Sequence, residues 1–125
     1  MIRLLIADDY PMIRTRIRRI LEDEPDIEVI CEAGNGKEIF ELLMLHEVDM
    51  VILDFNMPDM SGLEILAKLR TSYPGIPVLM LTALSEGMYS RKTVKAGAAG
   101  FISKESTREE LAPMIRKIST EKVLR

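Results

Sequence analysis

Five short apolar runs, each separated from the next by a longer amphipathic segment, constrain the fold of this chain more than any other feature. Each run has the length of one β-strand, and three of the five are nearly continuous in apolar character. Such continuity is typical of strands buried on both faces of a parallel sheet. The five expected strands are Ile2–Ala7, Ile27–Cys31, Met50–Leu53, Pro77–Leu81 and Gly100–Ile102.

The segments between these runs carry helical signals. Pro11 stands where the first residue of a helix is expected, and one-sided apolar patterns follow at helical spacing. Thr107 and Glu110 have the spacing of a capping box, which predicts that a last helix opens at this threonine. The other expected helices cover Lys37–Leu45, Leu63–Leu69 and Glu86–Ala96, of which the last has the weakest pattern.

Strand and helix therefore alternate five times, which predicts an α/β fold: a (βα)5 doubly wound parallel sheet with helices on both faces. A chain of 125 residues has the size of a single domain, and 47% hydrophobic with 30% charged residues excludes a disordered chain. In such sheets ligands bind beyond the carboxyl ends of the strands, where the strand order reverses. Functional residues are expected there.

Charge and cysteine content narrow the function classes. A formal net charge of −3 gives no electrostatic basis for a protein that mainly binds phosphate backbones. The single cysteine, Cys31, has no partner for a disulfide or a CxxC site, which favours a reducing, cytoplasmic location. The apolar runs are strand-sized and the N-terminus lacks a signal-peptide pattern, so we expect no membrane segment.

Polar side chains follow four of the five expected strands. Asp8 and Asp9 follow the first, Asp54 the third, Thr82 the fourth and Lys104 the fifth. Three carboxylates at one sheet edge repel unless a cation neutralises them, and ligands that are all oxygen favour Mg²⁺. A carboxylate beside such an ion can attack phosphorus, with a lysine and a hydroxyl contacting the phosphoryl oxygens. The pattern predicts a phosphoryl-transfer site.

Each of these residues could also have an ordinary structural role. Taken singly, the aspartates and Thr82 would cap helices or turns, and Lys104 would be a solvated surface lysine. Their joint placement at one edge of the sheet favours the phosphoryl site instead. Asn56, two residues past Asp54, is placed to add a backbone carbonyl as a further oxygen ligand.

These motifs resemble the receiver domain of two-component response regulators. In chain order they are Asp8-Asp9, Asp54-Phe55-Asn56-Met57-Pro58 with Gly62, Leu81-Thr82-Ala83, and Ala96-Gly97-Ala98-Ala99-Gly100-Phe101 leading to Lys104. The run from Lys104 to Thr107 is most similar to receivers of the NarL/LuxR group. The resemblance implies a CheY-like, flavodoxin-like fold for residues 1–125, with any C-terminal output domain outside them.

The resemblance also implies roles. Asp54 would accept phosphate from a sensor histidine kinase, and Phe101 would be an aromatic switch residue that moves with Thr82, although ordinary core packing also accounts for a phenylalanine there. Leu84 is apolar where a polar side chain would orient water, so we expect a long-lived phosphoryl group. The implied site residues are Asp8, Asp9, Asp54 and the Asn56 carbonyl for Mg²⁺, and Thr82 and Lys104 for the phosphoryl group.

The protein implied is a signalling switch rather than an enzyme, since it only assists its own phosphorylation and dephosphorylation. Its expected partners are the kinase, a second copy after phosphorylation, and DNA only through an absent C-terminal helix-turn-helix domain that would control transcription. The alternative is a free-standing receiver in a phosphorelay or a chemotaxis-type pathway.

Two function classes that share this fold fit the sequence less well. A flavodoxin-like cofactor binder needs a phosphate loop after the first strand, and a haloacid dehalogenase-like phosphatase needs an acid where Tyr10 stands. Arg14, Arg16, Arg18 and Arg19 are expected on the solvated face of the first helix, and His46 at a helix end on the surface.

Overall fold

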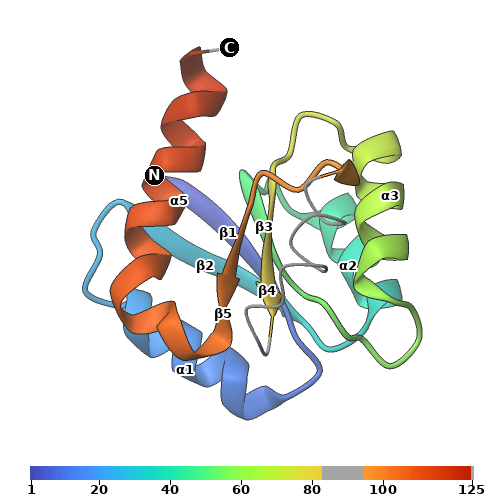
Figure 1. Cartoon of the computed structure of the whole chain (residues 1–125), viewed down its shortest axis with the longest axis horizontal. Helices are drawn as coiled ribbons and strands as arrows, with labels where there is room; N and C mark the ends of the chain where they lie inside the picture. The colour runs from blue at the N-terminus through green and yellow to red at the C-terminus, as the bar shows by residue number, and fades with distance from the viewer. Residues whose placement is uncertain (83–94, 125) are drawn as a thin grey trace.

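A five-stranded parallel sheet with the strand order β2-β1-β3-β4-β5 forms the centre of the molecule (Figure 1). The computed structural model describes residues 1–82 and 95–124, so Leu84 and nearly all of the expected helix Glu86–Ala96 lie outside the described residues. The predicted fold class is confirmed. The strands are β1 (Ile2–Ala7), β2 (Ile27–Ala33), β3 (Met50–Asp54), β4 (Val78–Thr82) and β5 (Gly100–Ser103).

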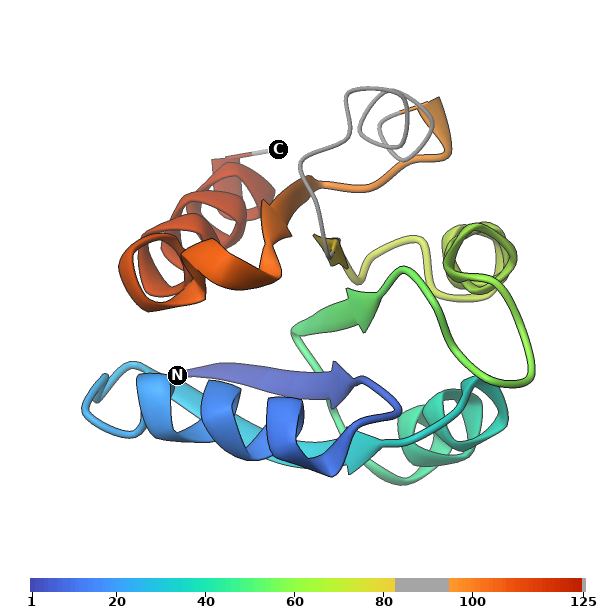
Figure 2. The same ribbon diagram turned by 60° about the horizontal axis from the view of Figure 1, so that its bottom comes forward.

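The described helices cover both faces of the sheet (Figure 2). On one face, α1 (Pro11–Leu21) and α5 (Thr107–Leu124) pack against β-strand residues such as Ile52. On the other face, α2 (Gly36–Leu45) and α3 (Gly62–Ser72) pack against residues such as Leu53. Every residue of β3 and β4 is buried, which agrees with their continuous apolar character.

Asp54 and Thr82 are the last residues of their strands rather than the first residues of loops. The register continues to the end, because Asp54 pairs with Leu81 of β4 and Thr82 pairs with Ser103 of β5. A side chain at the last position of a paired strand has a fixed direction, whereas one in the following loop does not. The sheet itself therefore places these two functional candidates.

The last helix begins at Thr107, as predicted, but Thr107 does not cap it. A 3-10 turn, η1 (Lys104–Ser106), precedes α5, and Thr107 already has helical backbone angles, with φ −62° and ψ −34°. An N-cap residue needs an extended backbone, so the capping-box prediction is wrong. The Thr107 hydroxyl instead donates to the Lys104 carbonyl at 3.3 Å. This contact joins the start of α5 to Lys104, one of the candidate site residues.

The chain order reverses between β1 and β3. From β1 the chain moves outward to the edge strand β2, then returns past β1 to form β3 on the other side. The carboxyl ends of these two adjacent strands therefore meet at the position where doubly wound sheets bind ligands. Within the described ranges, no helix is long and apolar enough to cross a membrane.

Candidate functional site

Three aspartates meet at the carboxyl ends of β1 and β3. Asp8 and Asp9 follow β1 directly and Asp54 ends β3, and one carboxylate oxygen from each lies within 4.8 Å of the others. Asp8 is 0% exposed and Asp54 is 3% exposed. We call these three carboxylates the acidic cluster.

Lys104 is the cation that faces the acidic cluster. It follows β5, and its Nζ lies 3.0 Å from Asp54 Oδ1 and 3.3 Å from Asp8 Oδ2. Burial lowers the pKa of this ammonium group, but the hydrogen bond and charge of Asp54, together with Asp8, outweigh burial and raise it. Lys104 therefore stays protonated and neutralises one of the three negative charges.

Asp54 is held in an environment that disfavours its charge. Burial raises the pKa of the Asp54 carboxyl group, and the neighbouring charge of Asp8 raises it further. The hydrogen bonds from Lys104 and from the backbone N–H of Asn56 lower it without cancelling the rise. Among the described residues Lys104 is the cation that faces the cluster, so its negative charge exceeds the positive charge beside it.

Two oxygens of the cluster have no hydrogen-bond partner among the described residues. They are Asp8 Oδ2 and Asp9 Oδ1, and both are buried. The Lys104 ammonium forms an ion pair with Asp8 Oδ2 at 3.3 Å. Buried carboxylate oxygens normally have partners. Three clustered carboxylates with two unsatisfied oxygens are a donor set that suits a hard, oxygen-preferring cation.

The other candidates lie on the neighbouring strands β4 and β5 and in the loop after β3. Thr82 is 6% exposed and stands one residue beyond Leu81, the register partner of Asp54. Asn56 is exposed and forms an antiparallel bridge with Ser61 in the loop after β3. Phe101 is 37% exposed on β5, so the interpretation of this residue as ordinary core packing is wrong.

Sequence reasoning missed the contacts that hold the loop between β3 and α3. The Asp59 carboxylate accepts hydrogen bonds from the backbone N–H groups of Gly36 at 2.7 Å and Lys37 at 3.1 Å, at the start of α2. The Gly62 N–H donates to the Phe55 carbonyl at 2.7 Å. These contacts fix the loop that carries Asn56. No local signal reveals Asp59, because its partners lie more than 20 residues earlier.

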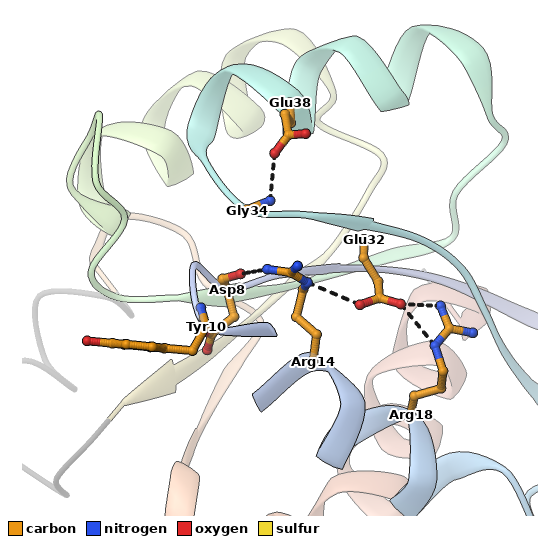
Figure 3. Close-up of polar contacts among 7 residues, drawn as sticks. All are labelled: Asp8, Tyr10, Arg14, Arg18, Glu32, Gly34 and Glu38. Carbon is orange, nitrogen blue, oxygen red and sulfur yellow. Dashed lines mark hydrogen bonds and ion pairs between the residues drawn. The ribbon is translucent and has the colours of Figure 1, made fainter. Parts of the chain in front are cut away.

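Arg14 was also missed as a site residue, and its assignment to the solvated face of the first helix is wrong. Its side chain is 19% exposed, and its Nη1 donates to the Asp8 backbone carbonyl at 2.6 Å (Figure 3). The sequence held a signal for this inward orientation. Arg14 shares a helix face with Ile17 and Leu21, at spacings of three and seven residues, and both of these are buried. Arg16 and Arg19 are exposed, as predicted.

A family model for the response regulator receiver domain matches residues 4–116. The chain belongs to the response regulator receiver family. Response regulator UvrY of Escherichia coli K12 is 37% identical over 118 residues, which cover 94% of this chain and 54% of that protein. Response regulator GacA of Pseudomonas aeruginosa is 35% identical over 118 residues, covering 94% of this chain and 55% of that protein.

Solved structures place this receiver domain in the same group. A DNA-binding response regulator of the LuxR family from Staphylococcus aureus superposes with a TM-score of 0.86 at 31% identity, covering 95% of this chain and 99% of that one. The resemblance to the NarL/LuxR group is therefore confirmed. The receiver domain spans about half the length of the full-length relatives it matches, as the shares of 54% and 55% show.

Proposed function

We propose that this receiver domain is a phosphorylation switch, in which Asp54 accepts a phosphoryl group from a sensor histidine kinase with the help of Mg²⁺. The observation that supports this most directly is the pairing of the buried Asp54 carboxylate with the Lys104 ammonium at 3.0 Å, beside two unsatisfied carboxylate oxygens. A buried nucleophile, a cation and free metal ligands are the parts that phosphoryl transfer to a carboxylate requires.

The transfer is a displacement at phosphorus. An oxygen of ionised Asp54 forms a bond to phosphorus while the bond from phosphorus to the donor nitrogen of the kinase histidine breaks, and the electron pair leaves with that nitrogen. The product is an acyl phosphate on Asp54. The Lys104 ammonium group neutralises negative charge on the transferred group, and the Thr82 hydroxyl donates a hydrogen bond to one of its oxygens.

The metal ligands in this proposal are the carboxylates of Asp8, Asp9 and Asp54 and the backbone carbonyl of Asn56. Bound Mg²⁺ supplies charge neutralisation for the phosphoryl oxygens and for the cluster itself. The unsatisfied oxygens Asp8 Oδ2 and Asp9 Oδ1 support this assignment, since a cation would give both a partner. Oxygen ligands without histidine or cysteine favour Mg²⁺ over transition metals.

The output of the switch is a change in protein contacts, and the domain acts as a signalling element rather than as an enzyme. We assign residues 1–125 to one receiver domain, in which phosphorylation draws Thr82 toward the phosphoryl group and moves the exposed ring of Phe101 inward. The expected result is altered dimerisation, or release of a C-terminal output domain that binds DNA and controls transcription in the cytoplasm. The name of the Staphylococcus aureus structure, a DNA-binding response regulator, supports this output. A free-standing receiver in a phosphorelay is the alternative.

Intact mass spectrometry after incubation with acetyl phosphate and Mg²⁺ tests the proposal. The wild-type domain should gain one phosphoryl group, and Asp54→Asn should not. Asp23→Asn, which makes the same charge change at an exposed site, serves as the matched control and should label like the wild type. Full labelling of Asp54→Asn would refute the assignment. Release of inorganic phosphate in large excess over protein would indicate a phosphatase instead.

A further inference from the structure

Two arginines one turn apart on α1 bind the same glutamate, but only one of them also reaches the backbone carbonyl of Asp8 (Figure 3). Arg14 Nε donates to Glu32 Oε1 at 3.1 Å, and Arg18 Nε donates to Glu32 Oε2 at 2.9 Å. Arg14 has a second contact, from Nη1 to the backbone carbonyl oxygen of Asp8 at 2.6 Å. Arg18 is more exposed, with 48% of its side chain accessible against 19% for Arg14.

The carbonyl that Arg14 binds belongs to the peptide unit between Asp8 and Asp9. The other backbone group of Asp8, its N–H, donates to the carbonyl of Ala33 on β2 at 3.0 Å. The Asp8 side chain is held as well, because its Oδ1 accepts from the Tyr10 N–H at 3.0 Å. Arg14 therefore holds the one backbone group of Asp8 that orients the following residue, Asp9.

This peptide unit lies under electrostatic strain. Asp8 Oδ2 and Asp9 Oδ1 are both buried without a hydrogen-bond partner among the described residues, and like charges so close repel. Rotation of the peptide unit that joins the two residues would let their carboxylates separate. A charge-assisted hydrogen bond to its carbonyl opposes that rotation.

An arginine suits this position better than a lysine. The guanidinium is a rigid planar fork, so an Nε–H directed at Glu32 fixes the direction of the Nη1–H that meets Asp8. Glu32 is in turn held by Arg18 and lies on β2 next to Ala33, so the fork is anchored to the sheet.

We propose that Arg14 is a positioning residue for the metal site: it fixes the peptide unit between Asp8 and Asp9 so that their carboxylates stay converged before a divalent cation binds. This inference rests on the proposed function, because it assigns Mg²⁺ to the acidic cluster. Arg14 would support the metal site without contacting the cation or the phosphoryl group. Through Arg14, the position of Glu32 on β2 also influences the peptide unit between Asp8 and Asp9.

Arg14→Gln and Arg18→Gln form a matched pair for the test. Both remove one positive charge from the same helix and one partner from Glu32, but only the first frees the Asp8 carbonyl. Mg²⁺ titration followed by calorimetry should show affinity about 10-fold weaker in Arg14→Gln, as for loss of an outer contact in other metal sites. Arg18→Gln should stay within about twofold of the wild type, as for an exposed ion pair.

The same variants separate positioning from a general structural role. With acetyl phosphate as donor, the labelling rate of Arg14→Gln should require more Mg²⁺ to reach half its maximum, yet approach the wild-type plateau when Mg²⁺ saturates. Arg14→Lys, which keeps the charge and one donor, should recover part of the affinity. Equal Mg²⁺ affinity in Arg14→Gln and Arg18→Gln would overturn the inference, even if both variants unfold more readily in urea.

Two further outcomes keep the inference and the proposed function distinguishable. A wild-type domain that binds no Mg²⁺ would refute the proposed function itself, whereas a wild-type domain that binds Mg²⁺ no more tightly than Arg14→Gln would refute only the role of Arg14. If Arg14→Gln does not fold, Glu32→Gln replaces it in the test. This variant leaves both arginines in place but weakens the contact that orients the Arg14 guanidinium group. It should weaken Mg²⁺ binding more than Arg18→Gln does, and affinity equal to that of Arg18→Gln would overturn the inference.

Discussion

Replacing Gly62 with alanine should destabilise the domain strongly, because the loop after β3 has no space for a side chain there. A Cβ at this position would lie 2.5 Å from the Phe55 carbonyl oxygen, 2.8 Å from its Cα and 2.9 Å from its carbonyl carbon. All three atoms are backbone atoms, so the loop itself must move. The movement would lengthen the 2.7 Å hydrogen bond from the Gly62 N–H to that carbonyl.

The size of the effect follows from these two losses. Forcing a methyl group into a packed site costs about 1–3 kcal/mol, and the net loss of one hydrogen bond costs about 1 kcal/mol. Gly62→Ala should therefore lower the free energy of unfolding by about 2–4 kcal/mol, a large share of the roughly 5–15 kcal/mol typical of a domain. Backbone angles add nothing to this cost, since Gly97 is the only described glycine with a positive φ.

Gly75→Ala is the matched control. A Cβ at Gly75 meets nothing within 4 Å, so the substitution should leave stability unchanged or raise it by up to about 1 kcal/mol through the unfolded chain. Urea unfolding followed by far-ultraviolet circular dichroism measures both variants. If the two variants lose the same free energy, or if Gly62→Ala loses less than about 1 kcal/mol, the steric argument fails.

Two further predictions concern titrating groups. Hydrogen bonds from the backbone N–H groups of Gly36 and Lys37 hold the pKa of the Asp59 carboxyl group below its usual value. The stability that the ionised carboxylate contributes is therefore present above about pH 4 and is lost as the pH falls through the lowered pKa. Asp59→Asn should therefore lower the free energy of unfolding at neutral pH and flatten the acid side of the stability curve. Urea unfolding across pH measures this, and an unchanged acid side would contradict it. Burial, together with the charge of Asp8, raises the pKa of the Asp54 carboxyl group in the folded domain. Ionisation of Asp54 therefore opposes folding once the pH rises above the ordinary pKa of an aspartate. In Mg²⁺-free buffer, Asp54→Asn should be more stable than the wild type at neutral pH, with an advantage that shrinks toward about pH 4; a variant less stable at neutral pH would show that the Lys104 pair outweighs burial.

The fold and the acidic cluster could be predicted from the sequence because both depend on local patterns. An apolar run that ends in aspartate marks the carboxyl end of a buried strand, and the topology of a doubly wound sheet brings such ends together. Asp8 and Asp54 needed no more information than this. Even the error at Asp54, expected in the loop but found within the strand, changed its position by a single residue.

The contacts that hold the site in shape could not be predicted in the same way. Asp59 binds N–H groups more than 20 residues away, and Arg14 binds both Asp8 and Glu32. A charged residue at a helix or loop position satisfies the sequence pattern whether it points to solvent or to another element. Helical spacing places Arg14, unlike Arg16, on the face of Ile17 and Leu21, but only the tertiary arrangement shows that its guanidinium reaches Asp8 and Glu32.

The long-range contacts of Arg14 and Asp59 support a site whose clustered carboxylates repel one another. The proposed metal site needs three carboxylates close together, but burial and mutual repulsion favour their separation or protonation, in line with the raised pKa of Asp54. Lys104 relieves the conflict only in part, because it faces Asp8 and Asp54 and leaves Asp9 Oδ1 without a partner among the described residues. Rigid backbone supports at Asp8 and in the loop carrying Asn56 keep the carboxylates converged against that repulsion. The unfavourable arrangement is then relieved when positive charge enters, which makes binding of a cation and ionisation of Asp54 mutually reinforcing.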